Sequence, residues 1–200
     1  MNLNLSGEEE QIVASVRGAL ARIAPISRFH RGGGDARLTC ELRAEAAALG
    51  WFGLGLPEDA GGVGCGPIEE MLLYRELGRG LGPVSMLYVS LAARIASLAG
   101  DVSLASELAS GAHGVALVVD EPGGGSRIFD ADGADYAVRF AEGDRADLIT
   151  LKSVKLDARP SLDKSASMAV GDVSQAKVVV GCEDASVRRL AQLGAAAMLV

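Results

Sequence analysis

The chain has 200 residues, of which 49% are hydrophobic, 22% are charged and 4% are aromatic. This much apolar material can fill a buried core, so the composition predicts a globular protein of one or two domains. The formal net charge is −7, and no basic cluster exceeds the pair Arg188 and Arg189, which excludes the electrostatic footprint of a nucleic-acid-binding protein.

Neither a membrane segment nor a metal site is expected. No stretch approaches about twenty uninterrupted apolar residues, and the opening MNLNLSGEEEQ lacks the basic start and apolar core of a signal peptide. We therefore predict a cytoplasmic protein that does not contact membranes. The cysteines (Cys40, Cys65 and Cys182) are odd in number and widely spaced, which argues against disulfides and zinc, and His30 and His113 stand alone.

Residues 1–113 are predicted to form a helical bundle. Ser6 and Glu9 have the spacing of a capping box, and the apolar residues that follow recur at helical spacing until Pro25 ends the first helix. A polar, glycine-rich connection then leads to a second amphipathic helix, which Gly50 is expected to close.

The bundle continues after a glycine-rich stretch, residues 51–66, that is not expected to be helical. Pro67 occupies a position typical of a first helical turn and starts the third helix. The fourth helix has a regular apolar stripe from Val84 onwards and stops at Gly100. Asp101 is expected to cap a short fifth helix.

Residues 114–181 are predicted to form a small β domain. Short β-prone runs are separated by Gly, Asp, Pro and Ser; they are GVALVV, DYAVRF, LITLKSVKL, SASMAV and AKVVV. No segment of helical length lies between them, so the strands should be largely antiparallel.

Residues 182–200 return to helical spacing, with Val187, Leu190, Leu193 and Met198 on one face. No capping residue closes this helix, and we expect no other part of the chain to cover its apolar face. We interpret it as the start of a truncated carboxy-terminal helical domain, whose apolar face is covered by a partner or by further chain. The predicted fold is α+β: an amino-terminal α-helical bundle, a small mostly antiparallel β domain and the start of a further helix.

The run DEPGGGSRI, from Asp120 to Ile128, follows directly on the first β-prone run. Short glycine runs are common in hairpin loops, and that is the simplest interpretation. Three consecutive glycines also let the backbone take positive φ and approach a planar or phosphorylated ligand closely, because no Cβ intervenes.

Three stretches carry a family resemblance. They are the opening LSGEEEQIVASVRGALARIAP, the segment from Leu49 to Val84 with its GLGLPEDAGGVG and ELGR elements, and LVVDEPGGGSRI. In order and spacing they resemble the acyl-CoA dehydrogenase flavoproteins. The resemblance covers nearly the whole chain and corresponds to the amino-terminal helical domain and the middle β domain of that family, without the carboxy-terminal helical domain.

The resemblance implies an FAD site at the glycine-rich loop. Leu117, Val119 and Asp120 would lie along the flavin ring. Gly125 and Ser126 would approach the phosphates, where main-chain N–H groups suit anionic oxygens.

This sequence departs from the family pattern inside that motif. Asp120 stands where the family usually has Thr, and a carboxylate there would repel an anionic flavin unless it were protonated or turned away. Arg127 stands in place of an Asp, and Leu117 in place of a Tyr. A G-x-K-x-W strand that covers one flavin face in the family has no counterpart, so the ring would be exposed or covered by another subunit.

The resemblance implies FAD-dependent α,β-dehydrogenation of an acyl-CoA thioester in fatty-acid or steroid side-chain metabolism, with an electron-transfer flavoprotein as acceptor. No catalytic residue is assigned, because the family's glutamate base lies in the carboxy-terminal domain. Glu69, Glu70 and Glu76 are expected to be solvated or capping residues.

The implied assembly is a homo-oligomer, or a hetero-oligomer with a second acyl-CoA dehydrogenase subunit. The alternative is a non-catalytic structural or regulatory subunit that does not bind FAD by itself. An acyl-CoA oxidase or a flavin monooxygenase of the same fold is a third possibility.

Overall fold

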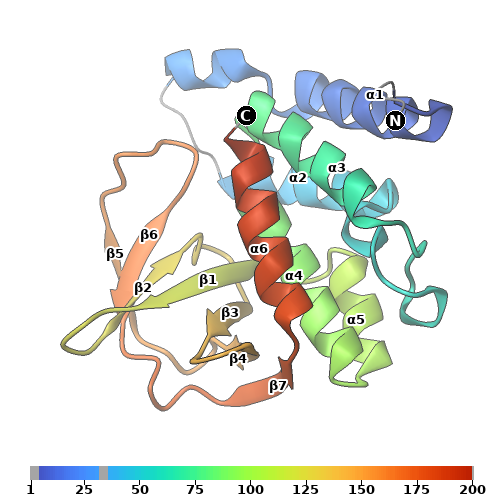
Figure 1. Cartoon of the computed structure of the whole chain (residues 1–200). Helices are drawn as coiled ribbons and strands as arrows, with labels where there is room; N and C mark the ends of the chain where they lie inside the picture. Colours follow the sequence, from blue (N-terminus) through green and yellow to red (C-terminus); the bar gives the residue numbers. More distant parts are fainter. Residues whose placement is uncertain (1–4, 32–35, 200) are drawn as a thin grey trace.

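A computed structural model describes residues 5–31 and 36–199. These residues form six α-helices, short 3₁₀-helices and one seven-stranded sheet, which is the α+β fold predicted from the sequence. Figure 1 shows the helices packed together on one side of the molecule and the sheet on the other. None of the described helices combines the length and the apolar character needed to cross a membrane.

The five predicted amino-terminal helices are confirmed; they are α1 (Gly7–Ile23), α2 (Ala36–Ala48), α3 (Pro67–Arg79), α4 (Ser85–Leu98) and α5 (Val102–Ala109). The capping box is complete, because the Glu9 N–H donates to Ser6 Oγ at 3.2 Å and the Ser6 N–H donates to Glu9 Oε2 at 2.6 Å. Gly50 has a φ of +73° after α2, and Asp101 Oδ1 accepts from the Leu104 N–H at 3.0 Å. Local signals therefore set these helix ends.

The connections between the first helices are more ordered than predicted. A 3₁₀-helix (Ile26–Arg31) occupies part of the polar connection after α1, while residues 32–35 of that connection lie outside the described residues. Between α2 and α3 there are two one-turn 3₁₀-helices (Trp51–Gly53 and Glu58–Ala60). The stretch is non-α-helical, as predicted, yet it contributes Trp51 to the core at 4% exposure.

The sheet contains β1 (Val115–Asp120), β2 (Ser126–Phe129), β3 (Tyr136–Phe140), β4 (Arg145–Thr150), β5 (Leu156–Arg159), β6 (Met168–Gly171) and β7 (Val178–Glu183). Its order is β5-β6-β2-β1-β3-β4-β7. Among the described strands, β1 and β3 pair in parallel and every other pair is antiparallel, so the mostly antiparallel arrangement is confirmed.

Two strand predictions need correction. The run LITLKSVKL, which is predicted as one β-prone segment, divides between β4 and β5, and these strands lie in opposite halves of the sheet. A turn separates them, in which the Lys152 N–H donates to Thr150 Oγ1 at 3.3 Å. The strand β2 was not among the predicted runs; its four residues are too few for a periodic signal.

The last helix, α6 (Ala185–Met198), is not left uncovered, and that expectation was wrong. It packs against α3 and α4, as Figure 1 shows. Val187 is fully buried, whereas Leu193 is 45% exposed and the neighbouring Gly194 is buried instead. A Cβ at Gly194 would lie 2.8 Å from Leu87 Cδ1, so the missing side chain lets α6 approach the bundle closely.

One core joins the helices to the sheet. Its buried members include Leu91 of α4 together with Val138 and Leu148 of the sheet. Val118 and Ile149 belong to a second cluster on the opposite face of the sheet. The sheet therefore has a helix-facing side and an outer side, and successive residues of each strand alternate between them.

Candidate functional site

The glycine-rich run forms the turn of the β1–β2 hairpin, which we call the glycine hairpin (residues 120–126). Asp120 pairs with Ser126, and the Glu121 N–H donates to the Gly125 carbonyl at 3.1 Å. The three glycines have φ angles of +105°, +99° and +85° in chain order, which a residue with a Cβ rarely adopts. Figure 1 shows this hairpin projecting from the sheet at the lower left.

The space around the tip of the glycine hairpin is not filled by described residues of this chain. No atom lies within 4 Å of the position that a Cβ would take on Gly123, Gly124 or Gly125. The N–H of Gly125 donates no main-chain hydrogen bond within the part of the chain that the structure describes. A free amide in open space can donate to an oxygen of a ligand.

The five predicted site residues divide between the two faces of the sheet. Leu117 packs against the core shared with the helices, and Val119, two residues further along the strand, is 45% exposed on that same face. Asp120 and Ser126 fall on the outer side by strand alternation. The structure thus brings Asp120, Gly125 and Ser126 together and leaves Leu117 and Val119 across the sheet from them.

Asp120 is engaged by two neighbours. Ser126 Oγ donates to Asp120 Oδ1 at 2.7 Å, and Ser126 itself is 5% exposed. Arg139 Nη2 lies 2.8 Å from Asp120 Oδ2. The carboxylate that replaces the family's Thr is therefore turned to the outer face and compensated by an arginine, so it does not face a ligand on the helix-facing side.

A pocket of about 500 Å³ lies beside the glycine hairpin, and we call it the hairpin pocket. Residues that line it include Glu121, Gly124, Gly125, Ser126, Lys155 and Arg159. Sequence reasoning missed the two basic residues, because they come from β5 and the turn before it, about thirty positions after the motif.

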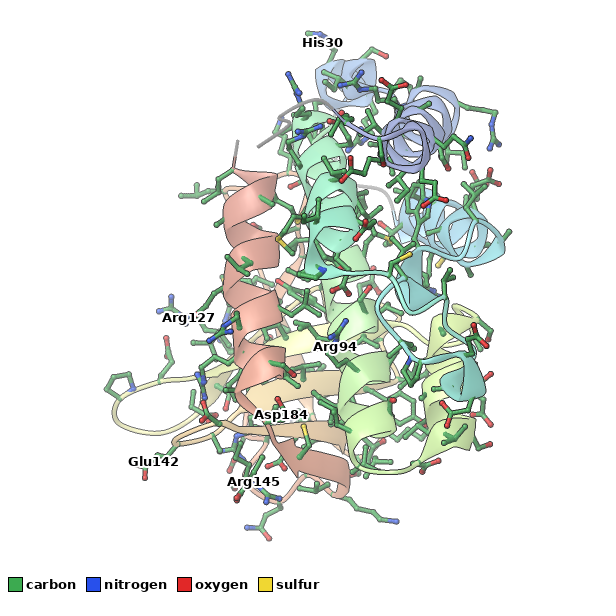
Figure 2. The ribbon with its side chains drawn as sticks, turned by 45° about the vertical axis from the view of Figure 1, so that its right-hand side comes forward. His30, Arg94, Arg127, Glu142, Arg145 and Asp184 are labelled. Carbon is green, nitrogen blue, oxygen red and sulfur yellow. The ribbon has the colours of Figure 1, made fainter. Side chains whose placement is uncertain are left out.

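The charged residues around the hairpin pocket are mostly paired. Arg159 Nη2 lies 2.7 Å from Asp157 Oδ2, and Arg127 Nε lies 2.5 Å from Glu121 Oε1. Arg127 pairs across the strands with Val119 and so projects from the helix-facing side, where Figure 2 places it beside α6. Lys155 forms no ion pair with any carboxylate among the described residues.

The hairpin pocket fits the phosphate-bearing part of FAD through its main chain. The Gly125 N–H has no main-chain acceptor among the described residues, and the open Cβ positions of the three glycines allow a ligand to approach the backbone closely. The side chains fit less well, since the hydroxyl of Ser126 already donates to Asp120. No aromatic residue of the described chain lines this pocket.

The acidic residues of α3 are structural, but two of them are buried rather than solvated. Glu70 Oε1 accepts from Arg94 Nη2 at 2.7 Å, and burial raises the pKa of Glu70; Figure 2 shows Arg94 on α4, beside α6. Burial alone would raise the pKa of Glu76, but hydrogen bonds from Arg17 and Arg75 outweigh it and lower that pKa. Both carboxylates are held by arginines and are not placed as catalytic bases.

A second titratable residue stands out in the loop after β2. Asp130 adopts a φ of +55°, and its Oδ1 accepts from the Ser167 N–H at 2.9 Å. Burial raises the pKa of Asp130 to about 6. It lines a cavity of about 160 Å³ between α2, the start of α4 and the loop at residues 164–167. Across residues 5–31 and 36–199, no group of three or more His, Cys, Asp or Glu could hold a metal ion.

A comparison with models of protein families identifies the class of protein that has this helical bundle, β sheet and glycine hairpin. Residues 6–119 match the family model described as acyl-CoA dehydrogenase, N-terminal domain. The chain therefore belongs to the acyl-CoA dehydrogenase family. No curated protein sequence matches it.

Solved structures share the fold. A glutaryl-coenzyme A dehydrogenase in a glutaryl-CoA complex is similar with a TM-score of 0.75 and 20% identity, over 99% of this chain and 64% of that one. A chain of the ChsE4-ChsE5 complex from Mycobacterium tuberculosis gives 0.72 and 18%, over 99% and 64%. An acyl-CoA dehydrogenase complexed with FAD from Bacillus anthracis gives 0.70 and 18%, over 88% and 36%. The chain thus spans less than two thirds of each of these proteins.

Proposed function

We propose that this chain is the flavin-binding portion of an acyl-CoA dehydrogenase, with a helical domain at residues 1–113, a β domain at 114–181 and the first helix of a third domain at 182–200. The observation that carries the proposal is the bare glycine hairpin with a free Gly125 N–H beside a pocket, in a chain of this family. The FAD complex of the Bacillus anthracis relative supports it.

Each part of the proposed site has a separate task. Leu117 and Val119 would present an apolar face to the flavin ring, and Gly125 would donate its N–H to a phosphate oxygen. Arg139 would hold the Asp120 carboxylate on the outer face, away from the ring. The bound flavin would supply hydride acceptance, and the substrate would be an acyl-CoA thioester.

The catalytic base, the electron acceptor and the assembly are proposed by analogy with the acyl-CoA dehydrogenase family. We assign no catalytic base to this chain, because Glu70 and Glu76 are buried in ion pairs and the pocket carboxylates Glu121 and Asp157 are paired with arginines. An electron-transfer flavoprotein would accept the electrons, and the chain would work in the cytoplasm as a homo-oligomer or a hetero-oligomer.

Flavin content tests the proposal directly. The purified protein, saturated with FAD and then desalted, should be yellow and should release one FAD per chain on denaturation. Release is measured by flavin absorbance and chain concentration by total protein. A colourless protein that takes up no FAD contradicts the proposal for this chain.

A second candidate function is a subunit without flavin in a heteromeric acyl-CoA dehydrogenase. The engagement of Ser126 by Asp120 favours it, since a hydroxyl that donates to a carboxylate has no proton left for a phosphate. The ChsE4-ChsE5 complex shows that a protein of this fold occurs with a second, differently named chain. This candidate predicts a colourless chain that becomes part of a yellow complex when mixed with its partner subunit.

A further inference from the structure

We infer that the hairpin pocket is a diphosphate-binding site in which Lys155, rather than Ser126, supplies the side-chain contact. The inference deepens the proposed function, on which it depends for the identity of FAD as the ligand. It concerns a residue that lies outside the glycine-rich motif and on a different hairpin.

The main-chain half of this site is the tip of the glycine hairpin. Gly124 and Gly125 line the pocket at positive φ, and nothing occupies the space above them. The Gly125 N–H has no main-chain acceptor within the described residues. Unpaired amides of this kind bind anions, and two adjacent phosphates offer several acceptor oxygens.

Sheet pairing brings Lys155 to the same pocket. Gly171 of β6 pairs with Ser126 on one side and with Leu156 on the other, so Lys155 lies about two strand spacings, roughly 10 Å, from the hairpin. A Cβ on Gly171 would lie 2.9 Å from the Lys155 carbonyl, so glycine is needed there for the two strands to approach. Lys155 lines the hairpin pocket together with Gly124 and Gly125, and its flexible four-carbon stem is long enough to bring the ammonium toward a diphosphate bound at the Gly125 N–H.

Charge pairing singles out Lys155 among the basic residues near the pocket. Arg159 is matched by Asp157 at 2.7 Å and Arg127 by Glu121 at 2.5 Å. Lys155 has no carboxylate partner in the described chain, although the protein as a whole carries a net charge of −7. An unmatched ammonium on a pocket wall attracts an anion without first having to break an ion pair.

Ser126 is excluded by its own hydrogen bond. Its single hydroxyl proton is donated to Asp120 Oδ1 at 2.7 Å, and Arg139 holds that carboxylate in place. Donation to a phosphate would require the hydroxyl to leave an ionised acceptor, which makes one of the stronger hydrogen bonds in proteins.

Calorimetric titration of the full chain with FAD, and separately with inorganic pyrophosphate, tests this assignment. Lys155→Ala should weaken the binding of both by about ten-fold, as expected for the loss of a charged hydrogen bond. Lys155→Arg should restore most of the affinity. Lys152→Ala is the matched control, because Lys152 lies in the same turn and does not line the pocket; it and Ser126→Ala should stay within about two-fold of the wild type. Circular dichroism confirms that each variant is folded.

The outcomes separate the inference from the proposed function. If the wild type binds FAD and Lys155→Ala binds it equally well, the inference is overturned and the proposed function stands. If the wild type binds pyrophosphate in a Lys155-dependent manner but not FAD, the inference stands and the proposed function fails. A wild type that binds neither ligand overturns both.

Discussion

Asp130 is the residue whose protonation should matter most for stability near neutral pH. Its left-handed backbone conformation suits Asp and Asn better than most residues, and its carboxyl is held at the Ser167 N–H. Burial raises its pKa to about 6, well above the usual value for Asp of about 3.9. The folded protein therefore holds this proton more tightly than the unfolded chain does.

The raised pKa of Asp130 determines how the free energy of unfolding changes with pH. Because the folded pKa is raised, the contribution of Asp130 to the free energy of unfolding is greatest below about pH 4 and is lost as the pH rises through about 6. Asp130→Asn is uncharged at every pH and keeps an acceptor for Ser167. It should be more stable than the wild type by about 1–3 kcal/mol at neutral pH and nearly equal to it at about pH 4. Urea unfolding across this range measures the difference; a gap that is independent of pH would contradict the assignment.

Packing between α3 and α6 depends on glycines that bring the two helices into contact. A Cβ on Gly78 would lie 2.1 Å from the Met198 carbonyl oxygen of α6, and one on Gly194 would lie 3.2 Å from Tyr74 Cδ2 of α3. Backbone atoms cannot move away as the end of a flexible side chain can. The glycine of the ELGR element is thus explained by helix packing.

Gly78→Ala should separate α6 from α3 and lower the free energy of unfolding by about 1–3 kcal/mol through overpacking. Gly18→Ala is the matched control, since Gly18 lies in the interior of α1 with nothing within 4 Å of its Cβ position. It should raise stability by about 0.5–1 kcal/mol, because glycine is a poor helix former. Urea unfolding of both variants tests this; the same sign for the two changes would be evidence against close packing at Gly78.

Sequence patterns predicted those elements whose signals are local. Helix starts at Ser6 and Asp101 are set by hydrogen bonds to residues three positions away, and both were predicted correctly. Strand order was not predictable in the same way, because it depends on pairings between distant segments. The separation of β5 from β4 and the cover that α3 and α4 give to α6 are of this kind.

In the candidate site, too, features with a local sequence signal were predictable and features that depend on distant strand pairings were not. The glycine run at residues 123–125 predicts a tight turn, and the structure has a turn there. Lys155 could not be predicted, because β5 and β6 carry it to the pocket through sheet pairing. The placement of Asp120 and Ser126 on the face opposite Val119 follows from strand alternation, but only once β2 is recognised as a strand.

The whole molecule is organised around a core that crosses from the helices into the sheet. Leu91 and Ile95 of α4 belong to the same buried cluster as Val138 and Leu148 of the sheet. A boundary near residue 114 therefore divides the chain by secondary structure type, while the packing on its two sides is continuous. Such a core favours unfolding as a single unit.

Differential scanning calorimetry should accordingly show one transition for the wild type. Leu148→Ala removes a fully buried side chain from the shared cluster and should cost about 2–5 kcal/mol, which lowers the Tm by roughly 5–15 °C without splitting the peak. Two resolved transitions, with only one of them shifted by Leu148→Ala, would show that the helices and the sheet unfold independently.

The late position of α6 in the chain has a consequence for biosynthesis. The surface of α3 and α4 that α6 covers is made before the strands of the sheet, whereas α6 leaves the ribosome only after β7. At about 5–20 residues per second, that apolar surface stays open for several seconds on the nascent polypeptide. During this interval the emerging bundle exposes an apolar surface that is prone to aggregation, and this exposure ends when α6 packs over it.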